Sequence, residues 1–361
     1  MVANAVAGGG ARAAVMLALT LGGLGLVSGC GKEDPPEPSA AASYRNCAPA
    51  SAGAQAAAPA NPLAGRPLFV DPNGPAVLQV ERWTGQQRAA DAASLRKIAD
   101  RPAALWISDG PGTVGARVDA VLTCAATQGQ LPVLVAYNIP NRDCGKYSSG
   151  GAASPDEYKA WIRAFAGGVR NRPVAVILEP DAIAHAVEGC ETESRYSLLS
   201  DAVAVLKATG SAAVYLDAGN PRWITDVRTV ATALQRSGID GADGFALNVA
   251  NFITTPENVA YGKQVSDATP GKPHFVIDTS RNGAGPVDGT GDEIDGGPRW
   301  CNPPGRLLGA APTTTNTGDT RVDALLWIKR PGESDGTCRA GEPPAGQWWP
   351  EYALDLAQRS H

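Results

Sequence analysis

The residues best suited to chemistry are acidic side chains that directly follow short apolar runs. Asp109, Asp181, Asp217 and Asp278 each stand at or just after the end of such a run, and Asp143 follows another one a few residues later. Carboxyl groups that gather in one place can divide the work of acid and base, because one keeps its proton while another stays ionised. The spacing therefore favours acid/base catalysis by carboxylates.

The elements that would position these carboxylates are repeated βα units. From Leu63 onward, short β-rich apolar runs alternate with longer amphipathic stretches, which is typical of helices packed around a parallel sheet. A closed barrel would bring the carboxyl ends of the strands, and so the acids, to one face. A doubly wound open sheet remains an alternative. The seven expected strands are Ala104–Ser108, Pro132–Asn138, Val174–Leu178, Ala212–Leu216, Gly244–Asn248, His274–Ile277 and Ala324–Ile328.

Asp143 and Asp181 are the acids with the clearest catalytic pattern. They would follow neighbouring strands, so each carboxylate would raise the proton affinity of the other. One of the two can then stay protonated near neutral pH. A protonated acid beside a leaving oxygen, with a second group acting on water, is what hydrolysis of a glycosidic bond requires.

Other common chemistries lack their residues in this chain. Histidine occurs only at His185, His274 and His361, and no H-E-x-x-H motif is present, so we expect no catalytic metal. The nucleophile elbow, the P-loop and the dinucleotide fingerprint are also missing, so we expect no cofactor. The formal net charge is −5 with no Lys/Arg run longer than a pair, which argues against nucleic acid as a partner.

Tryptophan is unusually frequent, with eight residues against five phenylalanines. Trp106, Trp223 and Trp300 lie in strand-end or loop segments, where a flat ring can stack on a pyranose. Trp161 and Trp327 are instead expected in the core.

The first 62 residues are predicted to lie outside the folded domain. Residues 1–29 resemble a secretory signal that ends in small residues before Cys30, the position a bacterial lipobox would lipidate. Residues 30–62 are rich in Pro, Ala and Ser and form an expected disordered tether, so the catalytic domain would span 63–361. We expect an exported monomer that touches the membrane only through a lipid on Cys30.

Export to an oxidising compartment makes disulfides expected among the remaining cysteines. Order along the chain suggests Cys144 with Cys190 and Cys301 with Cys338, and it leaves Cys47 and Cys124 as a candidate third pair. Spacing alone leaves other pairings open.

Several motifs, in order from Leu63 to the end, together resemble glycoside hydrolase family 6, the family of endoglucanases and cellobiohydrolases. Two of them carry the paired acids, Asp143 and Asp181. The motifs are Val135-Ala-Tyr-Asn-Ile-Pro-Asn-Arg-Asp-Cys144, Val176-Ile-Leu-Glu-Pro-Asp181, Tyr215-Leu-Asp-Ala-Gly-Asn-Pro-Arg-Trp223, Asn248-Val-Ala-Asn251, Ile277-Asp-Thr-Ser-Arg-Asn-Gly283, Trp300-Cys-Asn302 and Leu326-Trp-Ile-Lys-Arg-Pro-Gly-Glu-Ser-Asp-Gly336.

The resemblance implies an α/β fold, a distorted (β/α) barrel of about seven parallel strands with a groove or tunnel at its C-terminal face. It also implies cleavage of a β-1,4-glucan chain with inversion. Asp181 matches the family's proton donor, and Asp143 matches the aspartate that keeps the donor protonated and helps to position water. Asp335 matches the aspartate proposed as catalytic base, and sugar binding or a salt link to Lys329 or Arg281 is its alternative role.

The resemblance also implies substrate contacts. Tyr137 matches the tyrosine that crowds the sugar at the cleavage subsite, and Ser149 matches the serine that holds the hydrolytic water. Asn220 departs from the family, which commonly has His at this position, so contacts there are expected to differ. The further candidate sugar-binding residues are Trp106, Asp217, Trp223, Asn248, Asn251, Trp300, Lys329 and Glu333.

Loop length separates the two modes of action in this family, because long loops roof the groove into a tunnel in cellobiohydrolases. The loop Gly336–Gly346 is short, which favours an endoglucanase. An exo-acting cellobiohydrolase is the first alternative. A non-catalytic glucan-binding lipoprotein is the second, and the presence of Asp143, Asp181 and Asp335 argues against it.

Overall fold

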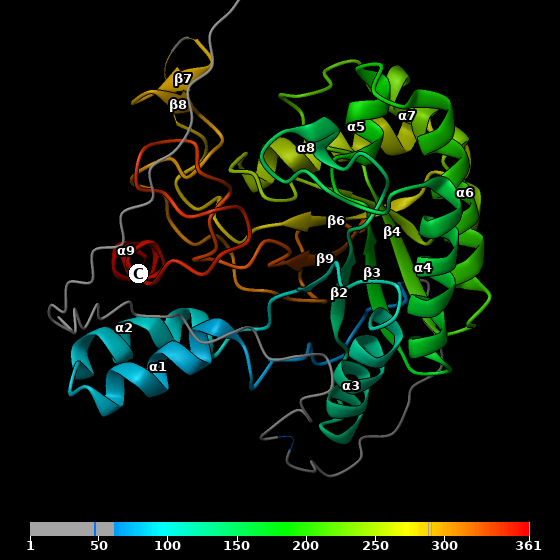
Figure 1. Cartoon of the computed structure of the whole chain (residues 1–361). Coiled ribbons are helices and arrows are strands. Elements are labelled where there is room, and N and C mark those ends of the chain that lie inside the picture. Colours follow the sequence, from blue (N-terminus) through cyan, green and yellow to red (C-terminus); the bar gives the residue numbers. More distant parts are fainter. Residues whose placement is uncertain (1–46, 48–60, 288, 290, 361) are drawn as a thin grey trace, which may run out of the picture. The chain divides into compact units, whose positions relative to one another are not determined.

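The computed structural model describes residue 47, residues 61–287, residue 289 and residues 291–360. The expected signal segment 1–29, Cys30 and most of the tether 30–62 lie outside the described residues. Seven parallel strands follow one another in the order β1-β2-β3-β4-β5-β6-β9 (Figure 1). They are β1 Leu105–Ile107, β2 Val133–Ala136, β3 Val174–Leu178, β4 Ala212–Asp217, β5 Gly244–Leu247, β6 His274–Asp278 and β9 Val322–Leu326.

All seven predicted strands are therefore confirmed, and the strand order decides between the two predicted folds. Each strand pairs with the next one along the chain, without the reversal of order that defines a doubly wound sheet. The sheet curls, so that its two edge strands approach each other: the amide of Ala104, just before β1, donates to the carbonyl of Trp327, just after β9, at 2.9 Å. The fold is a distorted, incompletely closed (β/α) barrel.

The strands form where they do because both faces of the sheet are buried. Along β3, Val176 and Leu178 face the surrounding helices, while Ala175 and Ile177 face the barrel interior. The β-branched and aliphatic runs that this arrangement needs are the runs seen in the sequence. Trp161 and Trp327 are buried at 0% and 3% exposure, which confirms their predicted place in the core.

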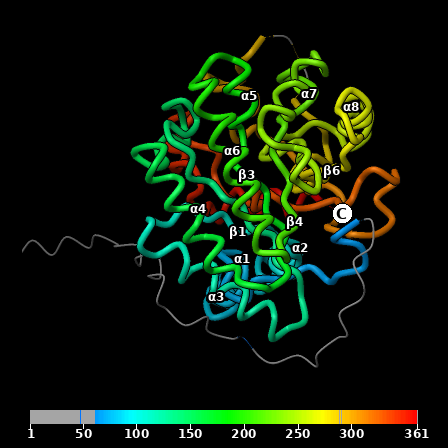
Figure 2. The backbone as a smooth tube through the Cα atoms, turned by 90° about the vertical axis from the view of Figure 1, so that its right-hand side faces the viewer, coloured from blue at the N-terminus to red at the C-terminus, as the bar shows by residue number. Residues whose placement is uncertain are grey.

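Helices cover the outer face of the sheet, and α4 and α6 run along the side that Figure 2 turns toward the viewer. The start of α4 is set by Ser154, whose hydroxyl accepts the amide of Glu157 at 3.2 Å, with Pro155 at the first position. The helices are α1 Pro75–Gly85, α2 Ala89–Ala99, α3 Val114–Thr127, α4 Pro155–Val169, α5 Ala182–Val187, α6 Thr192–Lys207, α7 Val227–Arg236, α8 Thr255–Ala268 and α9 Pro350–Arg359, with short 3₁₀ turns η1 Asp143–Gly145 and η2 Ile239–Gly241.

Two features lie outside the βα repeat. Helices α1, α2 and α9 pack together around Trp83, Leu95 and Ala353 and cover the region of Trp327 beside β9. The segment between β6 and β9 contains a small antiparallel hairpin of β7 Glu293–Ile294 and β8 Gly297–Pro298.

Three disulfides join the cysteines as chain order suggested. The structure contains the pairs Cys47–Cys124, Cys144–Cys190 and Cys301–Cys338. The first pair ties Cys47, within the expected tether, to α3. The other two lie in loops at the carboxyl end of the sheet, where each restrains the backbone beside a predicted catalytic or sugar-binding residue.

Candidate active site

The polar residues predicted to follow the strands lie together at the carboxyl end of the sheet. Hydrogen bonds join those on neighbouring strands. The amide of Asp181, after β3, donates to Asp217 Oδ2 at the end of β4, at 2.8 Å. Asn248, after β5, donates to the carbonyl of Asp278 at the end of β6, at 2.8 Å. The amide of Lys329, after β9, donates to Asp278 Oδ2 at 2.9 Å. The amide of Asn248 also donates to the carbonyl of Gly219, after β4, at 2.8 Å, so five strands contribute to one connected site.

Asp181 has the properties of a general acid. It caps α5 with a left-handed backbone, φ 69° and ψ −14°. Burial raises the pKa of Asp181 to about 6; the positive charge of His185 opposes this rise and the Asp143 carboxylate adds to it. Within the described residues no group donates a hydrogen bond to its carboxyl. Asp181 therefore keeps a proton in mildly acidic solution and has it free to give.

Asp143 lies in η1, on the loop after β2, with both carboxylate oxygens held. Its Oδ2 accepts the amide of Ser148 at 2.7 Å, and its Oδ1 lies 3.2 Å from His185 Nε2. The Cys144–Cys190 disulfide fixes the neighbouring backbone. The predicted electrostatic effect of Asp143 on Asp181 is present, but burial is a larger cause of the raised pKa than the second carboxylate.

Asp217, the last residue of β4, is 1% exposed. Burial, together with the Asp181 carboxylate, raises the pKa of Asp217 well above its usual range. Its observed contact is with the Asp181 amide, so in this structure Asp217 fixes the backbone of the acid. Its predicted contact with sugar stays a prediction.

Asp335, the candidate base, is held in a buried ion pair. Arg281 Nη1 and Nη2 each lie 2.9 Å from one of its carboxylate oxygens, and the amide of Asn302 donates to Oδ2 at 2.9 Å. Lys329 Nζ is 3.7 Å from Oδ1. Both oxygens of Asp335 are thus engaged by cationic or amide donors, as the predicted salt-link role requires.

The aromatic candidates occupy two parts of the site. Trp106 and Tyr137 meet edge to face at 4.9 Å, and Trp106 Nε1 donates to the carbonyl of Ile328 at 2.8 Å. Trp300 is 42% exposed and meets Tyr147, from the Asp143 loop, edge to face at 5.3 Å. An exposed indole is a surface on which a pyranose can stack.

The remaining predicted sugar-binding residues differ in how accessible they are. Ser149 is exposed on the Asp143 loop, whereas Glu333 is buried and paired with Arg330 at 2.6 Å. Asn248 is fully buried, and its Oδ1 accepts the amide of Ile253 at 3.0 Å, so its polar groups are used to shape the loop after β5. Asn251 similarly accepts the amide of Phe252 through its side chain.

Two buried carboxylates have roles that the sequence reasoning missed. Glu179 accepts the amides of Asn138 and Ile139 at 2.9 Å, and burial raises the pKa of Glu179 to about 7. Glu179 therefore holds the start of the loop that carries Asp143. Its place in the Glu-Pro-Asp motif was visible in the sequence, but nothing there showed that the side chain turns toward a neighbouring loop.

Asp278 plays the same part for three loops at once. Its two oxygens accept the amides of Ala250, Ser280, Ile328 and Lys329 at 2.9 to 3.2 Å. These amides belong to the loops after β5, β6 and β9. A single buried carboxylate thus fixes the positions of three loops relative to one another.

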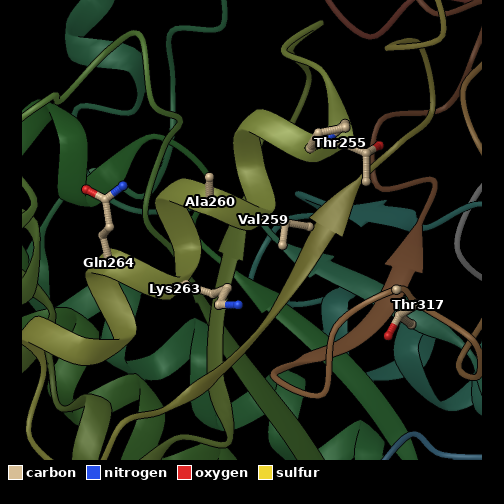
Figure 3. Close-up of a pocket in the computed structure, with 8 residues that line it drawn as sticks. Thr255, Val259, Ala260, Lys263, Gln264 and Thr317 are labelled. Carbon is tan, nitrogen blue, oxygen red and sulfur yellow. The ribbon is translucent and has the colours of Figure 1, made fainter.

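A cavity of about 650 Å³ lies elsewhere, between the outer face of α8 and the 317–318 turn (Figure 3). Val259, Ala260, Lys263 and Thr317 are among its lining residues, and no acidic residue lines it. It has no groups for the acid/base chemistry described above.

Comparison with known proteins agrees with this geometry. The model of the glycosyl hydrolases family 6 matches residues 63–360. Endoglucanase 1 of Streptomyces halstedii is 43% identical over 301 residues, covering 80% of this chain and 88% of that protein. Endoglucanase A of Cellulomonas fimi is 42% identical over 295 residues, covering 81% of this chain and 61% of that protein, so the match spans less than two thirds of this longer relative.

A solved structure shares the fold. It is the endoglucanase Cel6 from Mycobacterium tuberculosis in complex with methyl-cellobiosyl-4-deoxy-4-thio-β-D-cellobioside, with TM-score 0.75 and 44% identity, and the match covers 83% of this chain and 99% of that one. The family match and the similarity to named endoglucanases, together with the acids at the carboxyl end of the barrel, define this chain as a glycoside hydrolase. It belongs to the glycosyl hydrolases family 6.

Proposed function

We propose that this glycoside hydrolase cuts β-1,4-glucan chains internally and with inversion, using Asp181 as the general acid. The observation that carries the proposal is the carboxyl group of Asp181, which has a pKa of about 6 and is set beside the Asp143 carboxylate at the carboxyl end of the barrel. Relatives at 42–43% identity are named endoglucanases, and the similar Mycobacterium structure holds a thio-linked cello-oligosaccharide.

In the proposed reaction Asp181 gives its proton to the glycosidic oxygen while the bond from that oxygen to the anomeric carbon breaks. Water attacks the same carbon from the opposite face, which inverts the configuration, and its proton leaves through a second water to the solvent. Ser149 would hold the attacking water. Both oxygens of Asp335 are engaged by the Arg281 guanidinium, so we assign Asp335 to electrostatic orientation of the site.

The short loop 336–346 and the 42% exposure of Trp300 support the internal mode of cleavage. A chain can then enter from the side. An exo-acting cellobiohydrolase is the alternative, which would release cellobiose while the solution viscosity fell slowly.

The proposal is tested by digesting carboxymethylcellulose and following viscosity, reducing ends and the anomeric form of the first products by NMR. A fast fall in viscosity with α-anomers is expected from the wild type. Asp181→Asn should lower kcat by about 10²–10⁴-fold, because the amide has no proton to give. Asp240→Asn, which changes an exposed aspartate in η2, is the matched control and should keep wild-type activity.

Two results would contradict the proposal. First products of β configuration would show retention and remove the inverting mechanism. Full activity in Asp181→Asn would remove this residue as the acid.

We also propose that the protein is exported and anchored by a lipid on Cys30, on the strength of its signal-like leader and the lipobox-like residues before Cys30. None of the helices described in the structure is long and apolar enough to cross a membrane. Expressed in a bacterium that processes lipoproteins, the full chain should incorporate labelled fatty acid and sediment with membranes. Cys30→Ala should abolish labelling and release the enzyme, and unchanged labelling in this variant would refute the anchor.

A further inference from the structure

His185, in the last turn of α5, links the active site to a neighbouring carboxylate. Its side chain is 4% exposed. Nε2 lies 3.2 Å from Asp143 Oδ1, and Nδ1 lies 3.3 Å from Glu188 Oε2. Each nitrogen of the ring thus faces an oxygen of a different acidic side chain.

This arrangement selects one protonation state of the ring. A neutral imidazole carries one N–H and can donate to only one acceptor, whereas an imidazolium carries two. Ionised carboxylates accept hydrogen bonds and cannot donate them. The imidazolium is therefore the form that satisfies both Asp143 and Glu188 when both are ionised.

The charged groups around His185 come from several elements. Asp143 in η1 and Glu188 at the end of α5 contact the ring directly. The carboxyl of Asp181, at the start of the same helix, is also coupled to the charge of His185, and Arg195 from α6 and Lys329 after β9 add positive charge around that acid. Three carboxyl groups thus surround the imidazole, and the acid of the proposed reaction is one of them.

We propose that His185 is a positioning residue, which as an imidazolium fixes Asp143 in place and adjusts the proton affinity of Asp181. The inference rests on the proposed function of the site. Together with the amide of Ser148 on Oδ2, His185 leaves the Asp143 carboxylate with both oxygens held, so its direction relative to Asp181 is set.

The contact extends to a predicted sugar platform. Glu188 accepts the indole N–H of Trp223 through Oε1 at 2.7 Å, and the Trp223 ring packs edge to face on His185 at 5.1 Å. The chain Trp223–Glu188–His185–Asp143 therefore connects a surface for stacking on sugar to the carboxylate beside the acid. If the indole moves on sugar binding, these contacts would transmit the movement through Glu188 and His185 to the position of the Asp143 carboxylate.

The test is the pH dependence of kcat in His185→Gln, whose amide can still donate to Asp143 but carries no charge. The positive charge of His185 lowers the pKa of Asp181, so removing it raises that pKa. The alkaline limb of the profile, which reports loss of the acid's proton, should move up by about one pH unit. We also expect a larger change in kcat than in KM.

His274→Gln is the matched control. His274 also pairs with an aspartate, Asp323, at 2.7 Å, but it stands at the start of β6, at the opposite end of the strands from the acids. The alkaline limb of the kcat profile should lie at the same pH in this variant as in the wild type. A merely structural role of His185 would lower kcat in His185→Gln at every pH without moving the limb, and that result would overturn the inference.

A second readout does not depend on catalysis. Nitrogen NMR of the imidazole groups, assigned with the two variants, should show protons on both ring nitrogens of His185 even above the pH range in which an ordinary imidazole loses one of them, and Asp143→Asn should weaken that state. A singly protonated His185 in the wild type would also overturn the inference. If the wild type cuts no glucan, the proposed function fails, whereas the NMR result still decides the state of His185.

Discussion

At the scale of residues, the site separates two kinds of carboxyl group by what surrounds them. Asp181 sits where burial raises its pKa to about 6, so it holds a proton. Asp335 faces the guanidinium of Arg281 with both of its oxygens in a buried ion pair. Opposite environments thus give two aspartates at the same end of the barrel different chemistry.

The ion pair of Asp335 predicts a stability effect. Its side chain is 4% exposed and that of Arg281 is fully buried, so Asp335→Asn leaves a buried cation without its partner. We expect the free energy of unfolding in urea to fall by roughly 3–5 kcal/mol. Added azide, a small anion that can replace a missing base, should not restore activity to this variant.

The matched control is an exposed ion pair. Asp355 contacts Arg359 at 2.7 Å with side chains that are 43% and 53% exposed, and Asp355→Asn should cost about 0–1 kcal/mol. Equal losses in the two variants would show that burial of the Arg281 pair contributes nothing. Recovery of Asp335→Asn with azide would return the base role to Asp335.

At the scale of elements, the strands could be predicted because their signal is local. Each is a short, largely apolar run with polar side chains at its end or shortly after it, and all seven form at the predicted places. The order of the strands in the sheet cannot be predicted from such local patterns. Only the observed pairing, in which each of the seven strands lies beside the next of the seven, excludes the open doubly wound sheet.

The directions of side chains in the site were much harder to predict. Asp278 and Glu179 stand at the ends of strands just as the catalytic candidates do. Their side chains, however, accept hydrogen bonds from backbone amides and so fix loops. His185 meets Asp143 across 42 positions of sequence, because the short helix after β3 faces the loop after β2. Contacts of this kind depend on loop conformation, which no periodic pattern encodes.

At the scale of the whole molecule, the buried acids make stability depend on pH. Burial raises the pKa of Glu179 from 4.5 to about 7 and that of Asp181 from 3.8 to about 6. The unfolded chain loses these protons at lower pH than the folded protein does. Between about pH 4 and pH 7 the folded state thus binds more protons, and raising the pH favours unfolding.

We therefore expect the protein to unfold at a lower urea concentration at pH 7.5 than at pH 5. Acids whose pKa is lowered, such as Asp267 beside Arg321, lose their contribution only below about pH 4, outside this window. Asp181→Asn should reduce the difference between the two pH values, and Asp240→Asn should leave it unchanged. A wild type more stable at pH 7.5 than at pH 5 would contradict the prediction.

The Cys144–Cys190 disulfide makes the geometry of the acid pair sensitive to redox conditions. Cys144 directly follows Asp143, and Cys190 stands two residues after Glu188, so the covalent link spans the same two segments that His185 joins by hydrogen bonds. In a reducing compartment only noncovalent contacts, those of His185 and Glu179 among them, would hold the loop in place. Enzyme produced in a reducing cytoplasm would thus fold around a looser catalytic loop than enzyme oxidised after export.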